Sequence, residues 1–230
     1  MKQKQQIAFL LETLDNYYPK EVICYLNHRS PFELLIATIL SAQCTDDRVN
    51  QVTPGLFEQF PNVQAFATAD LKAVEEAIKS TGFYKNKAKN IIACSKRLVE
   101  CFDGQVPSDI DSLVTLAGVG RKTANVIRGN IFHIPSIVVD THVKRISIRW
   151  GITLYDDPVQ IEKDLMTKLP ESHWIRYNTQ VIAHGRSICT ARSPKCTICM
   201  FLSHCPYGLI QCQRQLPIEA ENAVAKGHMY

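Results

Sequence analysis

The amino-acid sequence predicts an all-α protein. Apolar residues recur at intervals of three and four along most of the chain, which is the period of helices with one buried face. The sequence contains no sustained alternation at period two, and its only β-branched run, 134–139, includes Pro135, a residue that central strands exclude. Of the 230 residues, 46% are hydrophobic and 21% charged. These values exclude disordered, collagen-like and fibrous proteins, and the length fits one large domain or two small ones.

Three segments of the first half carry the helical pattern most clearly. Residues 32–41 are apolar nearly all round, which predicts a buried helix. Residues 69–79 repeat apolar positions at three and four and place acids in the early turns, where the helix dipole favours them. Residues 86–99 gather apolar side chains along one stripe. We therefore expect three helices in this part of the chain.

Two further helical patterns, 110–116 and 121–131, are separated by a turn that contains two glycines. Asp109 precedes the first pattern, and Asp140 precedes a later apolar-periodic stretch. An aspartate in such a place accepts a hydrogen bond from an amide of the first helical turn. Both aspartates are therefore candidate helix N-caps.

The net charge of +4 is concentrated in the middle of the chain. Residues 81–150 carry 11 basic and 5 acidic side chains, whereas residues 1–80 carry 7 and 10. Six of the basic residues lie within 121–149, where Asp140 is the only acid. This distribution fits a face that binds a polyanion. An ordinary solvated face is the alternative.

Targeting and membrane segments are not evident in the sequence. The longest uncharged apolar-rich run, 34–42, is about half the length that spans a bilayer. The apolar run 7–11 near the start is interrupted by Glu12 and is too short for a secretory signal. We therefore expect a soluble cytoplasmic protein with no membrane partner.

Nine cysteines are present, and four of them form the pattern C-x6-C-x2-C-x5-C at Cys189, Cys196, Cys199 and Cys205. In a reducing compartment such a cluster indicates a metal site, because thiolates are soft ligands and four can enclose one tetrahedral centre. The spacing leaves zinc and a four-iron cluster open, since it matches neither the zinc-ribbon nor the ferredoxin spacings. Arg186, Arg192 and Lys195 lie nearby without an acid, which suits a phosphate contact.

The glycine turn, 116–123, is neither a P-loop nor a dinucleotide fingerprint. Arg121 stands where a P-loop has the glycine before its lysine, and the third glycine of a dinucleotide site is missing. Gly118 and Gly120 can instead direct backbone amides outward, so that these amides and the following helix N-terminus attract a phosphate. A plain hairpin of two helices, with glycines for close packing, is the alternative.

Lys122 is predicted to lie in the first turn of the helix that follows. The helix N-terminus and neighbouring Arg121 both disfavour an ammonium, and a neutral lysine amine is a nucleophile that can form a Schiff base. A solvated surface lysine is the alternative. Asp140 is either an N-cap only or a functional carboxylate as well.

Three motifs together resemble the endonuclease III family, which comprises bacterial DNA base-excision glycosylases of the helix-hairpin-helix superfamily. They are the hairpin 116–125, the segment 139–143 and the cysteine spacing. The resemblance extends from about residue 5 to Pro206 and includes the segments 40–43, 45–46 and 81–88.

The resemblance implies two helical lobes with a DNA-binding cleft between them. It implies a central lobe, 22–133, that ends in the helix-hairpin-helix motif at about 109–131, and a terminal lobe that combines 1–21 with 134–207 and carries the cluster loop 189–205. Residues 208–230 form a C-terminal tail beyond the family's common end, and they include Cys212.

The resemblance also implies the roles of individual residues. Lys122 is the expected nucleophile, and Asp140 is the carboxylate that assists it. The cysteine quartet is the ligand set of a [4Fe-4S] cluster. Gln43 fills the gap left by a flipped base, and Phe83 occupies the position where the family commonly has a wedging leucine. The further DNA-binding positions are Gly118, Gly120, Arg121, His142, Arg192 and Lys195.

Three positions depart from the family pattern: Ala117 replaces the usual proline before the hairpin, Phe83 replaces the leucine, and Cys44 replaces a small residue. Phe83 could alternatively be a core aromatic beside Tyr84.

The function implied is that of a monomeric, bifunctional glycosylase and AP lyase. It would bind duplex DNA with damaged bases or abasic sites, remove oxidised pyrimidines and cleave the abasic strand by β-elimination. The presence of Lys122 separates the chain from the adenine-removing mismatch glycosylases, which share the cluster and the aspartate but lack this lysine. The alternatives are a sibling glycosylase for mismatched thymine or uracil and a non-catalytic DNA-binding module with structural zinc.

Overall fold

The computed structural model describes residues 3–21 and 24–214, the last of these by its backbone alone. All regular elements of the described residues are helical, and none of these residues is in a β-strand, which confirms the all-α prediction. Contacts divide the chain into two compact units. The central unit spans Val22–Val138, and the terminal unit combines Met1–Glu21 with Val139–Tyr230. The boundary between the central and the terminal unit follows Val138, within an extended connector. It lies five residues after residue 133, where the sequence predicts the central lobe to end.

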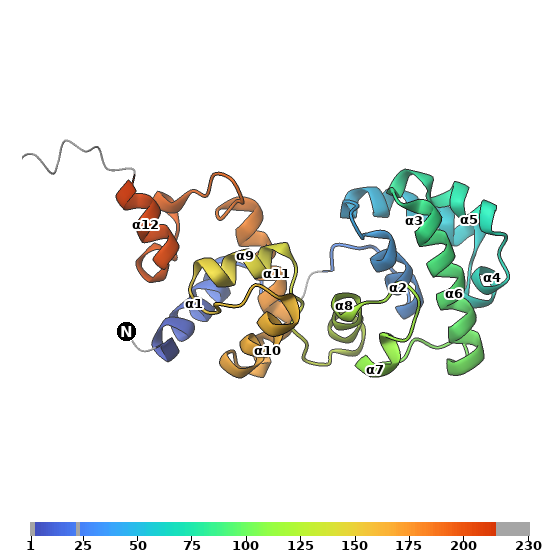
Figure 1. The fold of residues 1–230 in the computed structure, drawn as a ribbon, viewed down its shortest axis with the longest axis horizontal. Coiled ribbons are helices and arrows are strands. Elements are labelled where there is room, and N and C mark those ends of the chain that lie inside the picture. Colours follow the sequence, from blue (N-terminus) through green and yellow to red (C-terminus); the bar gives the residue numbers. More distant parts are fainter. Residues whose placement is uncertain (1–2, 22–23, 215–230) are drawn as a thin grey trace, which may run out of the picture. The chain divides into compact units, whose positions relative to one another are not determined.

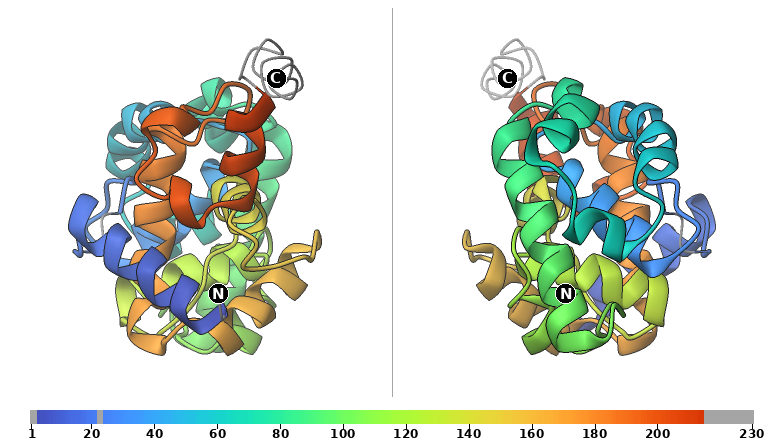
Figure 2. Two further views of the ribbon diagram at one scale, coloured as in Figure 1. Left: turned by 90° about the vertical axis from the view of Figure 1, so that its left-hand side faces the viewer. Right: turned by 90° about the vertical axis from the view of Figure 1, so that its right-hand side faces the viewer.

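The central unit is built around helices α2 and α6 (Figures 1 and 2). Short helices α4 and α5 pack on α6, and α2 packs on α3, α6 and α8. The elements of this unit are α2 (Pro31–Leu40), α3 (Asp46–Gln59), α4 (Val63–Ala67), α5 (Leu71–Ile78), the 3-10 turn η1 (Lys79–Thr81), α6 (Tyr84–Phe102), α7 (Ile110–Leu113) and α8 (Arg121–Phe132).

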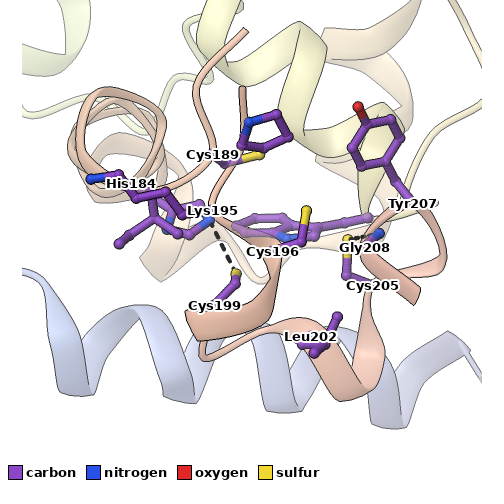
Figure 3. Close-up of a pocket in the computed structure, with 12 residues that line it drawn as sticks. His184, Cys189, Lys195, Cys196, Cys199, Leu202, Cys205, Tyr207 and Gly208 are labelled. Carbon is purple, nitrogen blue, oxygen red and sulfur yellow. Dashed lines mark hydrogen bonds between the residues drawn. The ribbon is translucent and has the colours of Figure 1, made fainter. Parts of the chain in front are cut away.

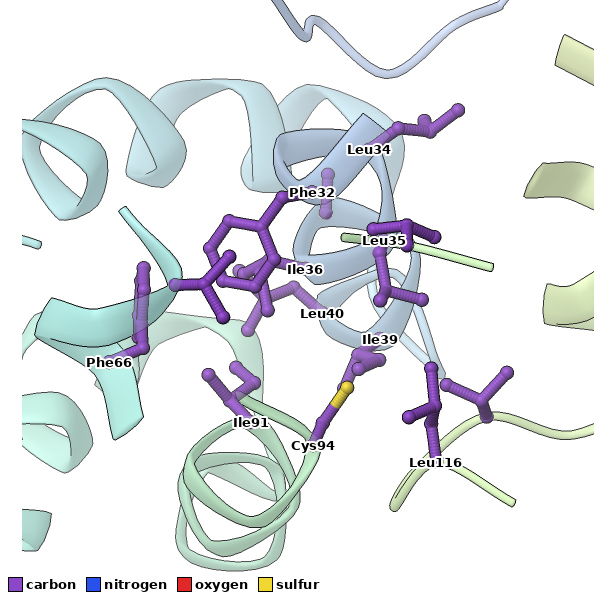
Figure 4. Packing of buried hydrophobic residues seen from close by; sticks show 14 of the residues in the cluster. Phe32, Leu34, Leu35, Ile36, Ile39, Leu40, Phe66, Ile91, Cys94 and Leu116 are labelled. Atoms are coloured by element: carbon purple, nitrogen blue, oxygen red, sulfur yellow. The ribbon is translucent and has the colours of Figure 1, made fainter. Parts of the chain in front are cut away.

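Helix α2 forms the centre of the core, as the nearly all-apolar segment 32–41 predicts. Its side chains from Leu34 to Leu40 are all buried. Figure 4 shows the leucines and isoleucines of this segment together with Phe66 of α4 and Ile91 of α6. The helix begins after Ser30, whose hydroxyl accepts a hydrogen bond from the Glu33 amide (3.1 Å). This cap satisfies one of the first amides of the helix, which have no intrahelical partner.

The predicted helix 110–116 is shorter in the structure. Asp109 caps α7 by accepting from the Ser112 amide (2.7 Å), and this hydrogen bond holds the pKa of Asp109 below its usual value. The helix ends at Leu113, after which the Leu116 amide donates to the Leu113 carbonyl (3.1 Å). This i to i+3 bonding tightens the chain into the turn that leads to α8.

The terminal unit joins the N-terminal helix to the C-terminal part of the chain. Helix α11 packs on α1 and α9, and α12 packs on α9 and on the two 3-10 turns of the cysteine loop (Figure 1). The elements of this unit are α1 (Gln3–Tyr17), α9 (Thr141–Arg149), α10 (Pro158–Lys168), η2 (Glu171–His173), α11 (Trp174–Ser187), η3 (Cys196–Ile198), η4 (Leu202–His204) and α12 (Pro206–Arg214).

A network of hydrogen bonds around Asp15 links α1 to α11. The two Asp15 carboxylate oxygens accept hydrogen bonds from Nε and Nη2 of Arg176 (3.1 Å each), and Gln180 donates to one of them (3.0 Å). Burial alone would raise the pKa of Asp15, but the hydrogen bonds from Gln180 and Arg176 outweigh it and lower that pKa. The network therefore stabilises the packing of the first helix on a segment some 160 residues away in sequence.

Residues 208–214 belong to α12, whereas the sequence predicts the start of a tail at 208. The chain lacks a clear apolar stripe here, and tertiary contacts hold the helix instead. Gly208 is buried against Leu202 and Cys205, and the Arg149 guanidinium lies 4.4 Å from the ring centroid of Tyr207. The remainder of the predicted tail, 215–230, lies outside the described residues. Within the described ranges, no helix is long and apolar enough to cross a membrane.

Candidate functional site

The turn between α7 and α8 exposes backbone at two glycines. Gly118 has a φ of +77°, and a Cβ there would lie 3.0 Å from Cβ of Asn90. Only glycine fits that position without strain. Gly120 has an ordinary φ of −89° and open space around it, so the fold itself does not require glycine there. The missing side chain leaves the start of α8 uncovered.

The N-terminus of α8 has no side-chain cap. Gly120 is the N-cap and offers no acceptor, so the first amides of the helix lack an intrahelical or capping partner. In contrast, a Ser, Thr, Asn or Asp side chain caps each of α2, α3, α4, α5, α7, α9 and α10. Free amides and the positive end of the helix dipole together attract an anion.

Two cations stand in the first turn of α8. Arg121 and Lys122 are both exposed. The Lys122 ammonium forms no hydrogen bond or ion pair with residues 24–138, so it is not engaged within the central unit. The structure thus places open amides and two basic side chains at one helix end.

Asp140 is the N-cap of α9. One of its oxygens, Oδ1, accepts a hydrogen bond from the Val143 amide (2.7 Å), and the side chain is half-buried. A carboxylate has a second oxygen that can accept further hydrogen bonds. The predicted cap is therefore present, and it leaves acceptor capacity for another role.

His142, on the first turn of α9, is packed against α11. Its Nδ1 lies 3.1 Å from Nη2 of Arg145, and a Cβ added at Gly185 would clash with Nδ1. Burial lowers the pKa of His142, although the charge of Asp140 opposes this. A neutral imidazole accepts the hydrogen bond from Arg145. The ring is half-buried, and its predicted contact with DNA stays a prediction.

Gln43 and Phe83 lie in two exposed turns of the central unit. Gln43 is between α2 and α3 with a φ of +53°, and Phe83 precedes α6 with a φ of +49°. Phe83 is 66% exposed, so the alternative that it is a core aromatic is wrong. Left-handed backbone is uncommon outside glycine, and it is concentrated where surrounding structure enforces it.

The cysteine quartet lines one pocket of the terminal unit. Cys189 follows α11, Cys196 begins η3, Cys199 follows η3, and Cys205 precedes α12. The pocket encloses about 300 Å³, partly open to solvent, and Figure 3 shows the four thiols around it together with His184 and Tyr207. Among the described residues, no three His, Cys, Asp or Glu side chains are arranged to hold a single metal ion.

Three of the sulfurs lie next to nitrogen atoms. Nη1 of Arg149 donates to Sγ of Cys189 (3.2 Å), and the Gly208 amide donates to Sγ of Cys205 (3.3 Å). Nε2 of His184 lies 3.8 Å from Sγ of Cys199 (Figure 3). Burial raises the pKa of Cys199 and raises that of Cys205 to about 11, although the Gly208 hydrogen bond opposes the shift at Cys205.

His184 is fully buried, and burial lowers its pKa to about 4. The Tyr18 hydroxyl lies 2.8 Å from Nδ1, and Nε2 faces Sγ of Cys199. Sequence reasoning missed this residue, because its partners lie 15 and 166 residues away.

The loop after Cys189 is held by Arg149, whose guanidinium donates to the carbonyls of Thr190 (2.8 Å) and Ala191 (2.9 Å). Arg145 likewise donates to the Cys189 carbonyl (3.1 Å). Both arginines belong to the basic segment 121–149, and both of their guanidinium groups bind backbone of the terminal unit. The predicted polyanion-binding role of this segment stays a prediction. Arg192 and Lys195 are exposed on the loop itself.

Residues 36–171 match the HhH-GPD superfamily of base excision DNA repair proteins. The fold and this match define a base-excision DNA repair protein. The chain is 48% identical to endonuclease III of Synechocystis over 88% of its own length and 93% of that relative. It is 45% identical to endonuclease III of Bacillus subtilis over 89% of its length and 93% of that relative.

Solved structures agree with these sequence matches. A non-covalent endonuclease III–DNA complex matches with a TM-score of 0.87 and 43% identity, over 93% of this chain and all of that chain. A trapped covalent endonuclease III–DNA intermediate matches with the same TM-score and identity, over 92% of this chain. A thermostable thymine-DNA glycosylase, at 20% identity and a TM-score of 0.76, shares the fold.

The chain belongs to the endonuclease III family, as its motifs predicted. It is therefore an enzyme of base-excision repair, a DNA glycosylase and AP lyase. This excludes the alternative of a non-catalytic DNA-binding module.

Proposed function

We propose that the protein removes oxidised pyrimidines from duplex DNA and cleaves the resulting abasic strand through a Schiff base on Lys122. The observation that carries this proposal is the exposed, unengaged Lys122 beside the uncapped start of α8, in a chain of the endonuclease III family. Action on the genome of a bacterial cell implies a cytoplasmic location.

The proposed chemistry begins with extrusion of the damaged nucleotide from the stack. The neutral Lys122 amine attacks the anomeric carbon of the sugar, a carbon–nitrogen bond forms, and the glycosidic bond breaks as the base leaves with a proton. Asp140 stabilises the positive charge that develops on the sugar and assists proton movement. Its cap to Val143 fixes the carboxylate while one oxygen remains open.

Strand cleavage follows from the same intermediate. The imine between lysine and the opened sugar makes the neighbouring carbon acidic. Loss of a proton there expels the 3′ phosphate by β-elimination, and water then hydrolyses the imine and frees Lys122. No oxidant or reductant is consumed in these steps.

DNA binding is proposed to use phosphate contacts on both units. The exposed backbone at Gly118 and Gly120, the first amides of α8 and Arg121 suit one phosphate. Arg192 and Lys195 on the cysteine loop suit another. Gln43 and Phe83, exposed at the tips of their turns, are proposed to fill the space that the extruded base leaves. A monomer suffices for all of these contacts.

The cysteine pocket is proposed to hold a [4Fe-4S] cluster, the cofactor of the endonuclease III family. Four thiols line one pocket, and three of their sulfurs have a nitrogen atom beside them, which suits a cluster held by four thiolates. Cys189, Cys196, Cys199 and Cys205 would hold the cluster, which would supply one-electron chemistry when bound.

A lesion panel tests the proposed function. Duplexes with thymine glycol, a G:T mismatch or uracil are incubated with the purified protein, and base release and strand products are measured separately. The proposal predicts base release from thymine glycol, with a β-elimination product, at a rate well above that on the other two duplexes. Preferential release of mismatched thymine or of uracil would instead identify the sibling specificity.

A further inference from the structure

A lysine with no role in the proposed chemistry is buried in the central unit. Lys87 lies in the first turns of α6, and the whole residue is only 4% exposed. Its ammonium donates to the carbonyls of Leu40 (2.7 Å) and Thr81 (2.8 Å). It forms no ion pair with any described residue. Burying an ammonium without a counter-ion is unfavourable, and burial lowers the pKa of Lys87.

The two carbonyls that Lys87 binds end two separate helical segments. Leu40 is the last residue of α2, and Thr81 is the last residue of η1. Both carbonyls lie at the negative ends of their segments, where a cation is favourable. The chain then continues from Leu40 to Gln43 and from Thr81 to Phe83. A single ammonium thus joins the bases of the two turns that expose these side chains.

The backbone at Gln43 and Phe83 is unlike the other left-handed positions. Among the described non-glycine residues, Asp103 and His133 also have a positive φ. Each of those two follows a helix end, and the next amide donates to the carbonyl of Leu98 (2.9 Å) or Arg128 (3.0 Å). That arrangement is a common helix C-cap.

No such C-cap explains the other two positions. Phe83 stands before α6 and makes no side-chain cap bond, and Gln43 lies inside the turn between two helices. The Phe83 carbonyl accepts from the Lys87 amide (3.2 Å). Lys87 therefore contacts the Phe83 turn through both its backbone and its side chain, while the ammonium reaches the Gln43 turn 47 residues away in sequence.

We propose that Lys87 is a positioning residue that holds the Gln43 turn and the Phe83 turn together, so that both side chains enter an opened base pair as one rigid unit. This rests on the proposed function, in which these two side chains replace the extruded base. Two turns that are far apart in sequence would otherwise have to be ordered separately when DNA binds.

Kinetics on two substrates test the proposal. Lys87→Met removes the ammonium and keeps an unbranched side chain, and Lys89→Met, at an exposed position of the same helix, is the matched control for the lost charge. Rates are measured at a temperature where circular dichroism shows all proteins folded. We expect Lys87→Met to slow base release from a thymine glycol duplex by about 10²-fold, to slow cleavage of a preformed abasic site much less, and Lys89→Met to change neither. Equal losses on both substrates would indicate a structural role only and overturn the proposal.

A double-mutant cycle shows whether Lys87 affects base release through Gln43 and Phe83 or independently of them. If Lys87 acts through the two turns, Lys87→Met adds little to the loss caused by Gln43→Ala and Phe83→Ala together. Multiplication of the two losses would contradict the proposal.

Hydrogen exchange tests, without any substrate, whether Lys87 holds the Gln43 turn and the Phe83 turn together. In Lys87→Met, amides of 42–45 and 82–84 should both exchange about tenfold faster or more than in the parent, and Lys89→Met should leave them unchanged. Unchanged exchange in Lys87→Met would show that Lys87 does not hold the two turns together. That result would overturn the positioning role of Lys87 regardless of which base the enzyme removes from DNA. An inactive parent with the expected exchange would instead overturn the proposed function alone.

Discussion

Helices α8 and α9 begin in opposite ways. The N-cap of α8 is Gly120, which has no side chain and leaves the first amides open beside Lys122. The N-cap of α9 is Asp140, whose carboxylate accepts from the Val143 amide at 2.7 Å. Both N-cap residues have extended backbone, so the difference lies in the side chain and not in the conformation.

The comparison shows how the same helical geometry serves two purposes. A capped start is complete within the protein and contributes to folding. An uncapped start forgoes that stabilisation and retains its amides and dipole for an external anion. In this enzyme the open start carries the candidate nucleophile, whereas the closed start fixes the candidate carboxylate.

The largest expected effect comes from giving α8 the cap of α9. Gly120→Asp fits the extended backbone and the open space at this position, so the carboxylate should bind the first amides and repel phosphate. We expect duplex affinity to fall by about 10²-fold or more, while the free energy of unfolding rises or stays constant. Fluorescence anisotropy with an abasic duplex and urea unfolding measure the two quantities.

Gly120→Asn separates the cap from the charge, since it should fall between the parent and Gly120→Asp in affinity. Affinity that does not change in Gly120→Asp would mean that the start of α8 does not bind phosphate.

The next effect sharpens the role of the closed start. Asp140→Asn keeps an oxygen that accepts from Val143 but removes the negative charge. Turnover should fall by about 10²-fold if the carboxylate stabilises developing positive charge, and the melting temperature should barely change. Single-turnover kinetics and thermal unfolding, measured on one preparation, distinguish a carboxylate that acts in the reaction from one that only caps α9. A turnover rate equal to that of the parent would mean that Asp140 is an N-cap only.

A smaller effect concerns the second phosphate contact, on the cysteine loop. Arg192→Ala and Lys195→Ala each remove an exposed cation and should weaken binding similarly on every DNA sequence. Each should reduce the slope of log affinity against log salt by about one. Binding titrations at several salt concentrations measure this slope, and a slope equal to that of the parent would place the loop away from DNA.

The smallest expected effect concerns Asp15, a charged residue that stabilises the fold and has no proposed role in the reaction. The pKa of Asp15 is lowered in the folded protein, so its contribution to stability is present above the unfolded value near 3.8 and is lost as the pH falls below about 4. Urea unfolding at pH 6 and pH 3.5 should show this loss, and Asp15→Asn should lose less stability between the two values. Equal losses in both proteins would exclude Asp15 from the acid sensitivity.

The parts of the fold that depend on neighbouring residues could be predicted from the sequence. The buried helix α2, the caps Asp109 and Asp140 and the hairpin glycines all follow from local pattern and cap chemistry. The exact end of α7 could not, because it depends on i to i+3 bonds that compete with helical bonds.

Features of the fold and of the site that depend on residues far apart in sequence could not be predicted. Arg149 is basic and lies in a basic segment, yet its partners are carbonyls about 40 residues away. Lys87 and His184 have no motif, and their roles appear only when the fold brings Leu40, Tyr18 and Cys199 to them. Helix α12 likewise depends on packing against the cysteine loop and not on its own apolar pattern.

The central claim is that the open start of α8 presents the nucleophile, and one measurement tests it directly. The protein is incubated with an abasic duplex and borohydride, the adduct is digested, and mass spectrometry identifies the modified residue. Lys122→Ala is compared with Lys96→Ala, which removes an exposed lysine of the same unit. The account predicts an adduct on Lys122, lost in Lys122→Ala and retained in Lys96→Ala. An adduct on another residue, or undiminished trapping by Lys122→Ala, would contradict it.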